Sequence, residues 1–196
     1  SSTSRGLGDV YKRQTNDFVG NPKWLFIYVN KYRKDIDAYW MCDNVHVVNY
    51  VKSLGFNAEL FHSKKAEKIK SVAGVFVVHQ VKEHIPVKFE NEVVILNLWH
   101  GVGIKPIERF VDSPGIRYRT YKKYIKYNEM YHNNQLFLVT SPLMEQHFTK
   151  MLNLDEDQII RAGYPANMFN KVEFRSFDHS IKRHKGLNAE TKVVLY

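Results

Sequence analysis

Residues 93–105 read Val93-Val-Ile-Leu-Asn-Leu-Trp-His-Gly-Val-Gly-Ile-Lys105 and join an apolar run to a glycine-rich turn. The apolar run, 93–99, has the length and composition of a buried strand. Buried strands that end in polar and glycine residues are typical of parallel α/β sheets, in which loops at the strand ends carry the chemistry. The segment therefore predicts a fold class and indicates where a site should lie.

Helix and strand patterns alternate on both sides of this segment. We expect helices at 21–32, 44–54, 63–70, 117–131 and 141–152, the first of them capped by Asn21. We expect strands at 37–42, 56–61, 72–79, 136–140 and 158–162, with 72–79 buried. Strands separated by helices imply a parallel sheet with right-handed crossovers. The prediction is an α/β fold with a Rossmann-like, doubly wound parallel sheet.

Composition excludes several other classes of protein. The 196 residues are 44% hydrophobic and 14% aromatic, enough for a core and too apolar for disorder. No apolar run approaches the ~20 residues of a membrane-spanning helix, and Cys42 is the only cysteine, so there is no disulfide framework. With no secretory signal at its start, the chain is expected in the cytoplasm. A net charge of 29 − 20 = +9 indicates an anionic partner.

Both ends of the chain depart from the globular pattern. Residues 1–14 show no hydrophobic period and are expected to be a non-native segment. Residues 15–173 form the expected N-terminal domain, and 174–191 read as a polar, basic linker. Residues 192–196 begin a strand with no element after it, so the chain is expected to be a fragment.

The loop after the 93–99 strand carries the densest chemistry. His100, at the strand end, can act as a general base. Gly101 and Gly103 let backbone N–H groups approach an anion, and Lys105 adds a mobile positive charge. Together they suit a phosphorylated substrate. Glycine-flanked strand ends also serve as ordinary turns, and spacing alone leaves both interpretations open.

The same loop is neither of the common phosphate-binding motifs. It lacks the third glycine of a dinucleotide fingerprint and the Lys-Ser/Thr pair of a Walker loop. The other histidines form no metal pattern either, because His79 and His84 have no Glu or Cys at ligand spacing. We therefore expect no metal and no cofactor.

Asn97-Leu-Trp-His-Gly-Val-Gly-Ile-Lys105 resembles the Trp-His-Gly-x-x-x-Lys signature of the CDP-glycerol glycerophosphotransferases, which include teichoic acid primases and polymerases and their capsule relatives. Further segments match that family in the same order: Gly20–Lys23, Ser63–Ala66, Thr140-Ser141 and Gly163–Pro165. Two segments depart from it. Ala166-Asn167-Met168 replaces the usual Arg-Asn-Asp, and Val102-Gly103-Ile104 replaces Thr-Pro-Leu. These departures leave CDP-ribitol or capsule synthesis open.

The resemblance implies the N-terminal, acceptor-side half of a GT-B-type enzyme, with 192–196 starting the donor-binding domain. It implies transfer of glycerol phosphate from CDP-glycerol, or a related CDP-alcohol, to a lipid-linked acceptor, with CMP released. The enzyme would be bacterial and bound peripherally to the inner face of the cell membrane, and this fragment alone would be inactive. His100 would be the base. The residues expected to contact phosphate or substrate are Asn21, Gly101, Gly103, Lys105, Ser141 and Gly163.

Residues 104–126 interleave basic side chains with tyrosines. This pattern fits an interfacial helix on anionic lipid or a core-facing aromatic stripe with a solvated basic face. Two rival functions remain at this stage. One is a GT-B glycosyltransferase that uses a nucleotide-sugar. The other is a nucleic-acid-binding module, against which stands the lack of a recognised nucleic-acid motif.

Overall fold

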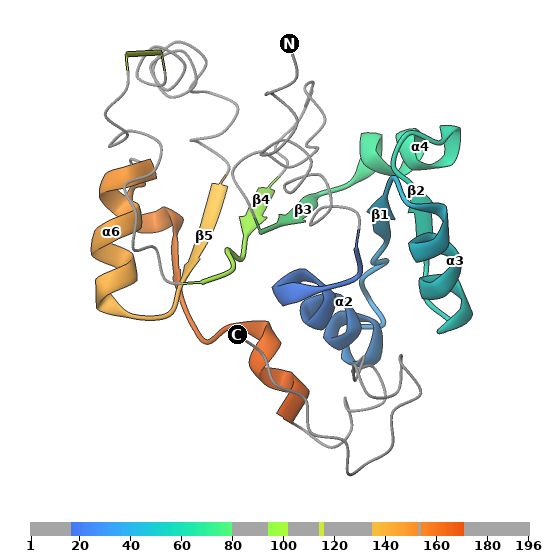
Figure 1. The fold of residues 1–196 in the computed structure, drawn as a ribbon, viewed down its shortest axis with the longest axis horizontal. Coiled ribbons are helices and arrows are strands. Elements are labelled where there is room, and N and C mark those ends of the chain that lie inside the picture. Colours follow the sequence, from blue (N-terminus) through green and yellow to red (C-terminus); the bar gives the residue numbers. More distant parts are fainter. Residues whose placement is uncertain (1–16, 80–93, 102–113, 116–134, 153, 171–196) are drawn as a thin grey trace, which may run out of the picture. The chain divides into compact units, whose positions relative to one another are not determined.

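A computed structural model of the chain describes residues 17–79, 94–101, 114–115, 135–152 and 154–170. Chain contacts divide the protein into two units, 1–166 and 167–196, and the site lies in the first. Helices and strands alternate along that unit (Figure 1). The helices are α2 (Gly20–Tyr32), α3 (Val45–Ser53), α4 (Lys64–Val72) and α6 (Pro142–Leu152), with 3₁₀ turns η4 (Glu156–Gln158) and η5 (Pro165–Asn170).

The described strands form two parallel sheets. In the smaller sheet, β1 (Trp40–Cys42) pairs with β2 (Ala58–Leu60). The larger sheet has the order β3 (Val75–Val78), β4 (Val94–Asn97), β5 (Gln135–Val139) and β6 (Ile159–Arg161). Every pairing is parallel, so the carboxyl ends of the paired strands lie at one edge of each sheet. The predicted α/β class is confirmed.

An apolar cavity of about 460 Å³ separates the two sheets, and both β1 and β3 line it. The chain runs from β1 outward to β2, then returns to β3 and runs outward through β4 and β5 to β6. This reversal is the doubly wound connectivity that the sequence predicted. Among the described strands, β1 and β3 are not paired with each other, so the prediction of a fully buried 72–79 strand was wrong. Val75 and Val77, which share one face of β3 and line this cavity, are 53% and 40% exposed.

The core of the larger sheet is aromatic and centres on the packing of α6 on β5. Phe137 and Phe148 are fully buried, with ring centroids 4.9 Å apart. Trp99 packs its ring edge-on against Phe148 at the same distance, so the strand end after β4 is anchored in this core. The apolar spacing of 141–152 predicts that Leu143, Met144, Phe148, Met151 and Leu152 are buried. The structure buries the last four, whereas Leu143 is 66% exposed.

A second aromatic cluster joins α2 to β1. The Phe18 ring lies 4.7 Å from Trp40, and Phe26 lies 5.7 Å from Trp40. The ammonium of Lys23 is buried here and sits 4.5 Å from the Trp24 ring centroid, a cation–π contact. These contacts fix the start of α2, which faces the end of β4.

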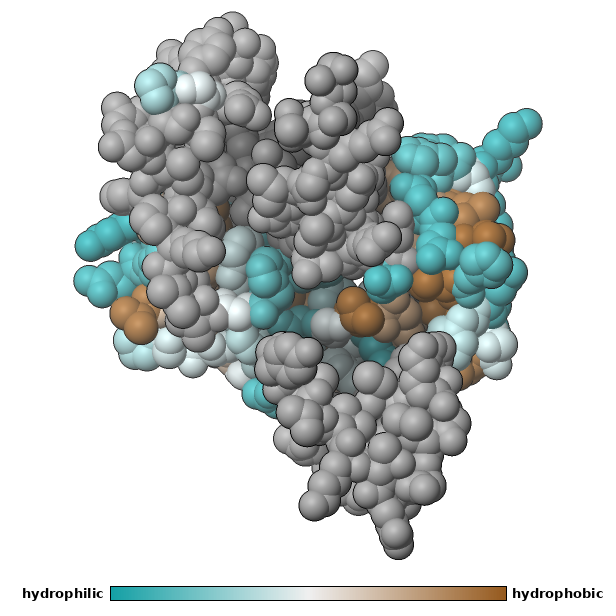
Figure 2. Space-filling view, in the orientation of Figure 1, coloured by the Kyte–Doolittle hydropathy of each residue, from teal (hydrophilic) through white to brown (hydrophobic). Residues whose placement is uncertain are grey.

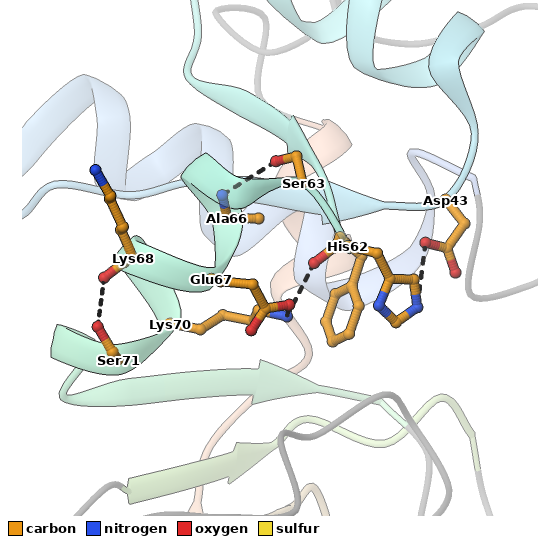
Figure 3. Close-up of polar contacts among 9 residues, drawn as sticks. Asp43, His62, Ser63, Ala66, Glu67, Lys68, Lys70 and Ser71 are labelled. Carbon is orange, nitrogen blue, oxygen red and sulfur yellow. Dashed lines mark hydrogen bonds and ion pairs between the residues drawn. The ribbon is translucent and has the colours of Figure 1, made fainter.

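Three of the four described α-helices, α3, α4 and α6, begin at a side-chain cap. The side chain of Asn44 accepts a hydrogen bond from the His46 backbone N–H, and Ser63 accepts one from Ala66 (Figure 3). The prediction that Asn21 caps α2 was wrong. Val19 holds the cap position, and α2 begins one residue earlier than expected, after which the Asn21 side chain is used elsewhere.

The side chain of Lys70 connects α4 to the residue that follows β2, Phe61 (Figure 3). It is 5% exposed, and its ammonium donates hydrogen bonds to the Phe61 carbonyl at 2.9 Å and to Glu67 at 2.6 Å. The same ammonium lies 3.9 Å from the Phe61 ring centroid. The outer surface near α3 and α4 mixes apolar with hydrophilic side chains (Figure 2), and Val45, Leu60 and Val72 are exposed there.

Several predicted segments lie outside the described residues. These are the 117–131 helix, most of the basic–aromatic stretch 104–126, the linker 174–191 and the strand 192–196. In the part of the chain that is described, no helix is both long and apolar enough to cross a membrane.

Candidate functional site

The candidate site lies at the carboxyl edge of the larger sheet. His79 follows β3, Trp99-His100-Gly101 follows β4, Thr140 follows β5, and Tyr164 follows β6. Because all four strands run parallel, these residues converge at one edge. The start of α2 joins them through Asn21, whose amide reaches the chain after β4.

His100 is held in one tautomer by the neighbouring strand. Its Nδ1 lies 2.7 Å from the backbone carbonyl oxygen of His79. A carbonyl oxygen can only accept, so Nδ1 carries the proton and the neutral ring presents an unprotonated Nε2. The ring is exposed and stacks on Trp99 with centroids 4.5 Å apart. The arrangement leaves Nε2 able to take a proton from a bound group.

The residue before His100 has a strained backbone. Trp99 has φ of 51°, the only positive φ at a non-glycine residue among those described. That conformation costs a bulky L-residue roughly 1–2 kcal/mol. Two buried asparagines hold it. Asn97 Oδ1 accepts from the Trp99 N–H at 3.0 Å, and Asn21 Nδ2 donates to the Trp99 carbonyl at 2.8 Å.

His79 is a site residue that sequence reasoning missed. Burial, and secondly the neighbouring His100, lower the pKa of the His79 ring to about 4, so it is neutral at neutral pH. The two rings meet edge to face, 6.1 Å apart. The sequence could have predicted His79 from its position at the end of the strand that precedes β4, because consecutive parallel strands are usually neighbours.

Tyr164 closes the other side of the site. Its hydroxyl donates to the Gly101 carbonyl at 3.0 Å and lies 3.5 Å from the sulfur of Met144, near the start of α6. Burial raises the pKa of the Tyr164 phenol, so it stays protonated and keeps donating. The loop after β4 is therefore held by β3 on one side and by the chain after β6 on the other.

The structure describes five of the seven predicted site residues. His100 and Gly101 lie at the sheet edge, and Gly163 is exposed beside Tyr164. Ser141 stands at the start of α6, where its hydroxyl accepts from the Met144 N–H at 3.3 Å. Asn21 is 5% exposed, with its amide bonded to backbone groups. Gly103 and Lys105 lie outside the described residues.

Within the described ranges, no group of three His, Cys, Asp or Glu side chains is placed to hold a metal ion. The His100 ring donates to the backbone carbonyl of His79, and this bond orients the ring.

Doubly wound parallel strands with a histidine at their carboxyl edge define a Rossmann-like α/β domain, which is the predicted fold class. The chain belongs to the CDP-Glycerol:Poly(glycerophosphate) glycerophosphotransferase family, whose sequence profile matches residues 10–196. The match begins at residue 10, inside the segment 1–14 that was expected to be non-native. No curated protein matches the chain.

Among solved structures, the chain is similar to the wall teichoic acid polymerase TagF, with 21% identity and a TM-score of 0.62. A variant of that polymerase with a histidine replaced by asparagine, soaked with CDPG, gives 21% identity and a TM-score of 0.63. Each comparison covers 90% of this chain and 43% of the polymerase chain. The likeness shows the fold, and the chain spans less than half the length of these structures.

Proposed function

We propose that the chain is the acceptor-side part of a glycerophosphotransferase that transfers glycerol phosphate from CDP-glycerol to a lipid-linked acceptor in teichoic acid or capsule synthesis. The family membership supports this proposal. The observation that carries it is the His100 tautomer, because a ring protonated at Nδ1 offers Nε2 as a base at the edge where parallel sheets bind ligands.

In this mechanism the terminal hydroxyl of the acceptor attacks the β-phosphorus of CDP-glycerol. The hydroxyl proton passes to Nε2 of His100, a phosphodiester bond forms, and the bond between the β-phosphorus and the bridging oxygen breaks. That oxygen leaves with CMP. A general base of this kind contributes roughly 10²–10⁴-fold in rate.

Electrostatic stabilisation would come from the same loop. We assign the backbone amides of Gly101 and Gly103 and the ammonium of Lys105 to the phosphoryl oxygens, where developing charge is greatest. Ser141, at the start of α6, and the exposed Gly163 would contact substrate. Asn21 would act on the substrate through the loop that it holds.

The enzyme would work at the inner face of the cell membrane, because its acceptor is lipid-linked. The basic residues and tyrosines of 104–126 are the segment we expect to meet anionic headgroups. Co-sedimentation with vesicles containing anionic lipid, at low and at high salt, tests this. Salt-sensitive binding supports peripheral attachment, and equal recovery with neutral vesicles contradicts it.

The activity is tested with a full-length version that carries these residues, supplied with CDP-glycerol and a lipid-linked acceptor. We expect CMP release and glycerol phosphate incorporation, and His100→Ala should abolish transfer without unfolding the protein. His46→Ala, on an exposed position of α3, is the matched control. Near-normal transfer by His100→Ala removes this residue from the mechanism.

A donor screen separates the proposal from its rivals. CDP-glycerol, CDP-ribitol and UDP-sugars are offered under the same conditions, with the 196-residue chain alone as a further sample that should be inactive. Preference for CDP-ribitol would keep the mechanism and change the polymer. Turnover of a UDP-sugar alone would favour a glycosyltransferase instead.

A further inference from the structure

We propose that Asn21 and Asn97 form a clamp that holds Trp99 in its left-handed conformation and thereby positions His100. Both are positioning residues, acting through the backbone of a third residue. The inference rests on the proposed role of His100 as base, and it adds two residues whose side chains need not touch substrate.

The clamp engages both polar backbone groups of Trp99. Asn97, the last residue of β4, is 1% exposed, and its Oδ1 accepts from the Trp99 N–H at 3.0 Å. Asn21, at the start of α2, donates from Nδ2 to the Trp99 carbonyl at 2.8 Å and to the Leu98 carbonyl at 3.4 Å. The N–H and the carbonyl of this buried residue are therefore both hydrogen-bonded within the protein.

Regular pairing with β3 ends directly before the clamp. The Leu98 N–H still donates to the Val78 carbonyl at 2.8 Å, as in a continuing parallel ladder. At Trp99, φ of 51° turns the chain out of the strand direction. Because φ and ψ of one residue aim the next, this turn brings the His100 ring back to the His79 carbonyl.

A relaxed Trp99 would lose that alignment. In an extended conformation, the peptide that joins Trp99 to His100 would rotate, and Nδ1 of His100 would move away from the His79 carbonyl. The ring would then be free to adopt the other neutral tautomer, which puts the proton on Nε2 and removes the base. The side-chain hydrogen bonds from the two asparagines offset the strain that otherwise favours this relaxation.

Asn21 also links the clamp to the far side of the site. Its Oδ1 accepts from the Ala166 N–H at 3.1 Å. Two residues earlier, the Tyr164 hydroxyl donates to the Gly101 carbonyl at 3.0 Å. The side-chain amide of Asn21 therefore connects the loop after β4 to the turn after β6. This connection fixes the position of His100 relative to the exposed Gly163.

The test measures the tautomer of His100 in the 196-residue chain by ¹⁵N NMR of the imidazole nitrogens. The native protein should show a protonated Nδ1. Asn97→Ala and Asn21→Ala should each give a mixture of the two tautomers, whereas Asn97→Asp keeps an acceptor for the Trp99 N–H and should retain the native one. Val139→Ala, a buried substitution in β5, is the control for destabilisation alone.

In the full-length version, the two alanine variants should lower kcat by roughly 10²-fold with little change in KM, since a misplaced base affects the chemical step. Native tautomers in both alanine variants, with no more loss of stability than in Val139→Ala, would overturn the clamp. A tautomer change together with unimpaired transfer by His100→Ala would keep the clamp and reject the proposed function.

Discussion

The imidazole of His100 donates from Nδ1 to the backbone carbonyl of His79, 2.7 Å away, so the end of β3 fixes the tautomer of a residue that follows β4. The acceptor of this bond belongs to the backbone and not to the His79 ring. The His79 side chain is therefore free to be studied by substitution without removing the acceptor.

The stability of the chain should fall in mild acid because of His79. Its pKa is about 4 in the folded protein against 6.5 for an ordinary histidine, so the unfolded chain binds more protons between these values. The contribution is complete above pH 6.5 and is lost as the pH falls toward 4. Between about pH 7 and pH 5 we expect a loss of about 1–2 kcal/mol, measured by urea unfolding of the 196-residue chain.

His79→Gln identifies the source of this pH dependence. The variant has no titrating ring at that position and should lose less stability between the same two pH values. His46→Gln, at an exposed position of α3, serves as the control. An unchanged slope in His79→Gln would mean that other groups cause the acid sensitivity.

The cap of α4 should contribute measurably to stability. The Ser63 hydroxyl accepts from the Ala66 N–H at 3.1 Å, which satisfies one of the free N–H groups at the helix start. Ser63→Ala should cost about 1 kcal/mol in thermal or urea unfolding, and Ser63→Asp should restore most of it. Ser71→Ala is the matched control, because its hydroxyl only donates to the Lys68 carbonyl near the helix end (Figure 3). Equal losses in Ser63→Ala and Ser71→Ala would contradict a capping role.

Local signals predicted most of the described fold. Asn44 and Ser63 start their helices, and Gly55, with φ of 84°, follows α3 where a left-handed residue ends a helix. The prediction failed where burial depends on neighbours distant in sequence. Val75 and Val77 have the composition of a buried strand, and their exposure follows from the cavity between β3 and β1.

The site was predictable in part for the same reason. The glycine-flanked histidine at a strand end identified His100, because that pattern is local. The roles of His79 and of Asn97 depend on strand order and on the turn at Trp99, which no spacing rule gives. Asn21 was selected through the family resemblance, and the structure shows its amide bonded to the backbone after β4.

Lys70 should be the most important lysine of α4 for stability. It combines hydrogen bonds to the Phe61 carbonyl and to Glu67 with a contact on the Phe61 ring. Lys70→Ala removes these contacts and leaves a void beside the cavity wall, so we expect a loss of about 2–3 kcal/mol. The measurement is urea unfolding, with Lys68→Ala at an exposed position of the same helix as the control, for which we expect about 0.5 kcal/mol or less.

Lys70→Met separates the charge of this side chain from its packing. Methionine keeps an unbranched apolar stem of similar length and lacks the ammonium. If Lys70 acts mainly through packing, Lys70→Met should lower the free energy of unfolding by about 1 kcal/mol or less. A loss equal to that of Lys70→Ala would assign the effect to the ammonium and its partners instead.

Added salt distinguishes these partners further, because the bond to the exposed Glu67 is screened, whereas the contacts with the Phe61 carbonyl and ring are shielded from solvent. A salt-independent loss in Lys70→Met would therefore point to Phe61 as the partner that matters.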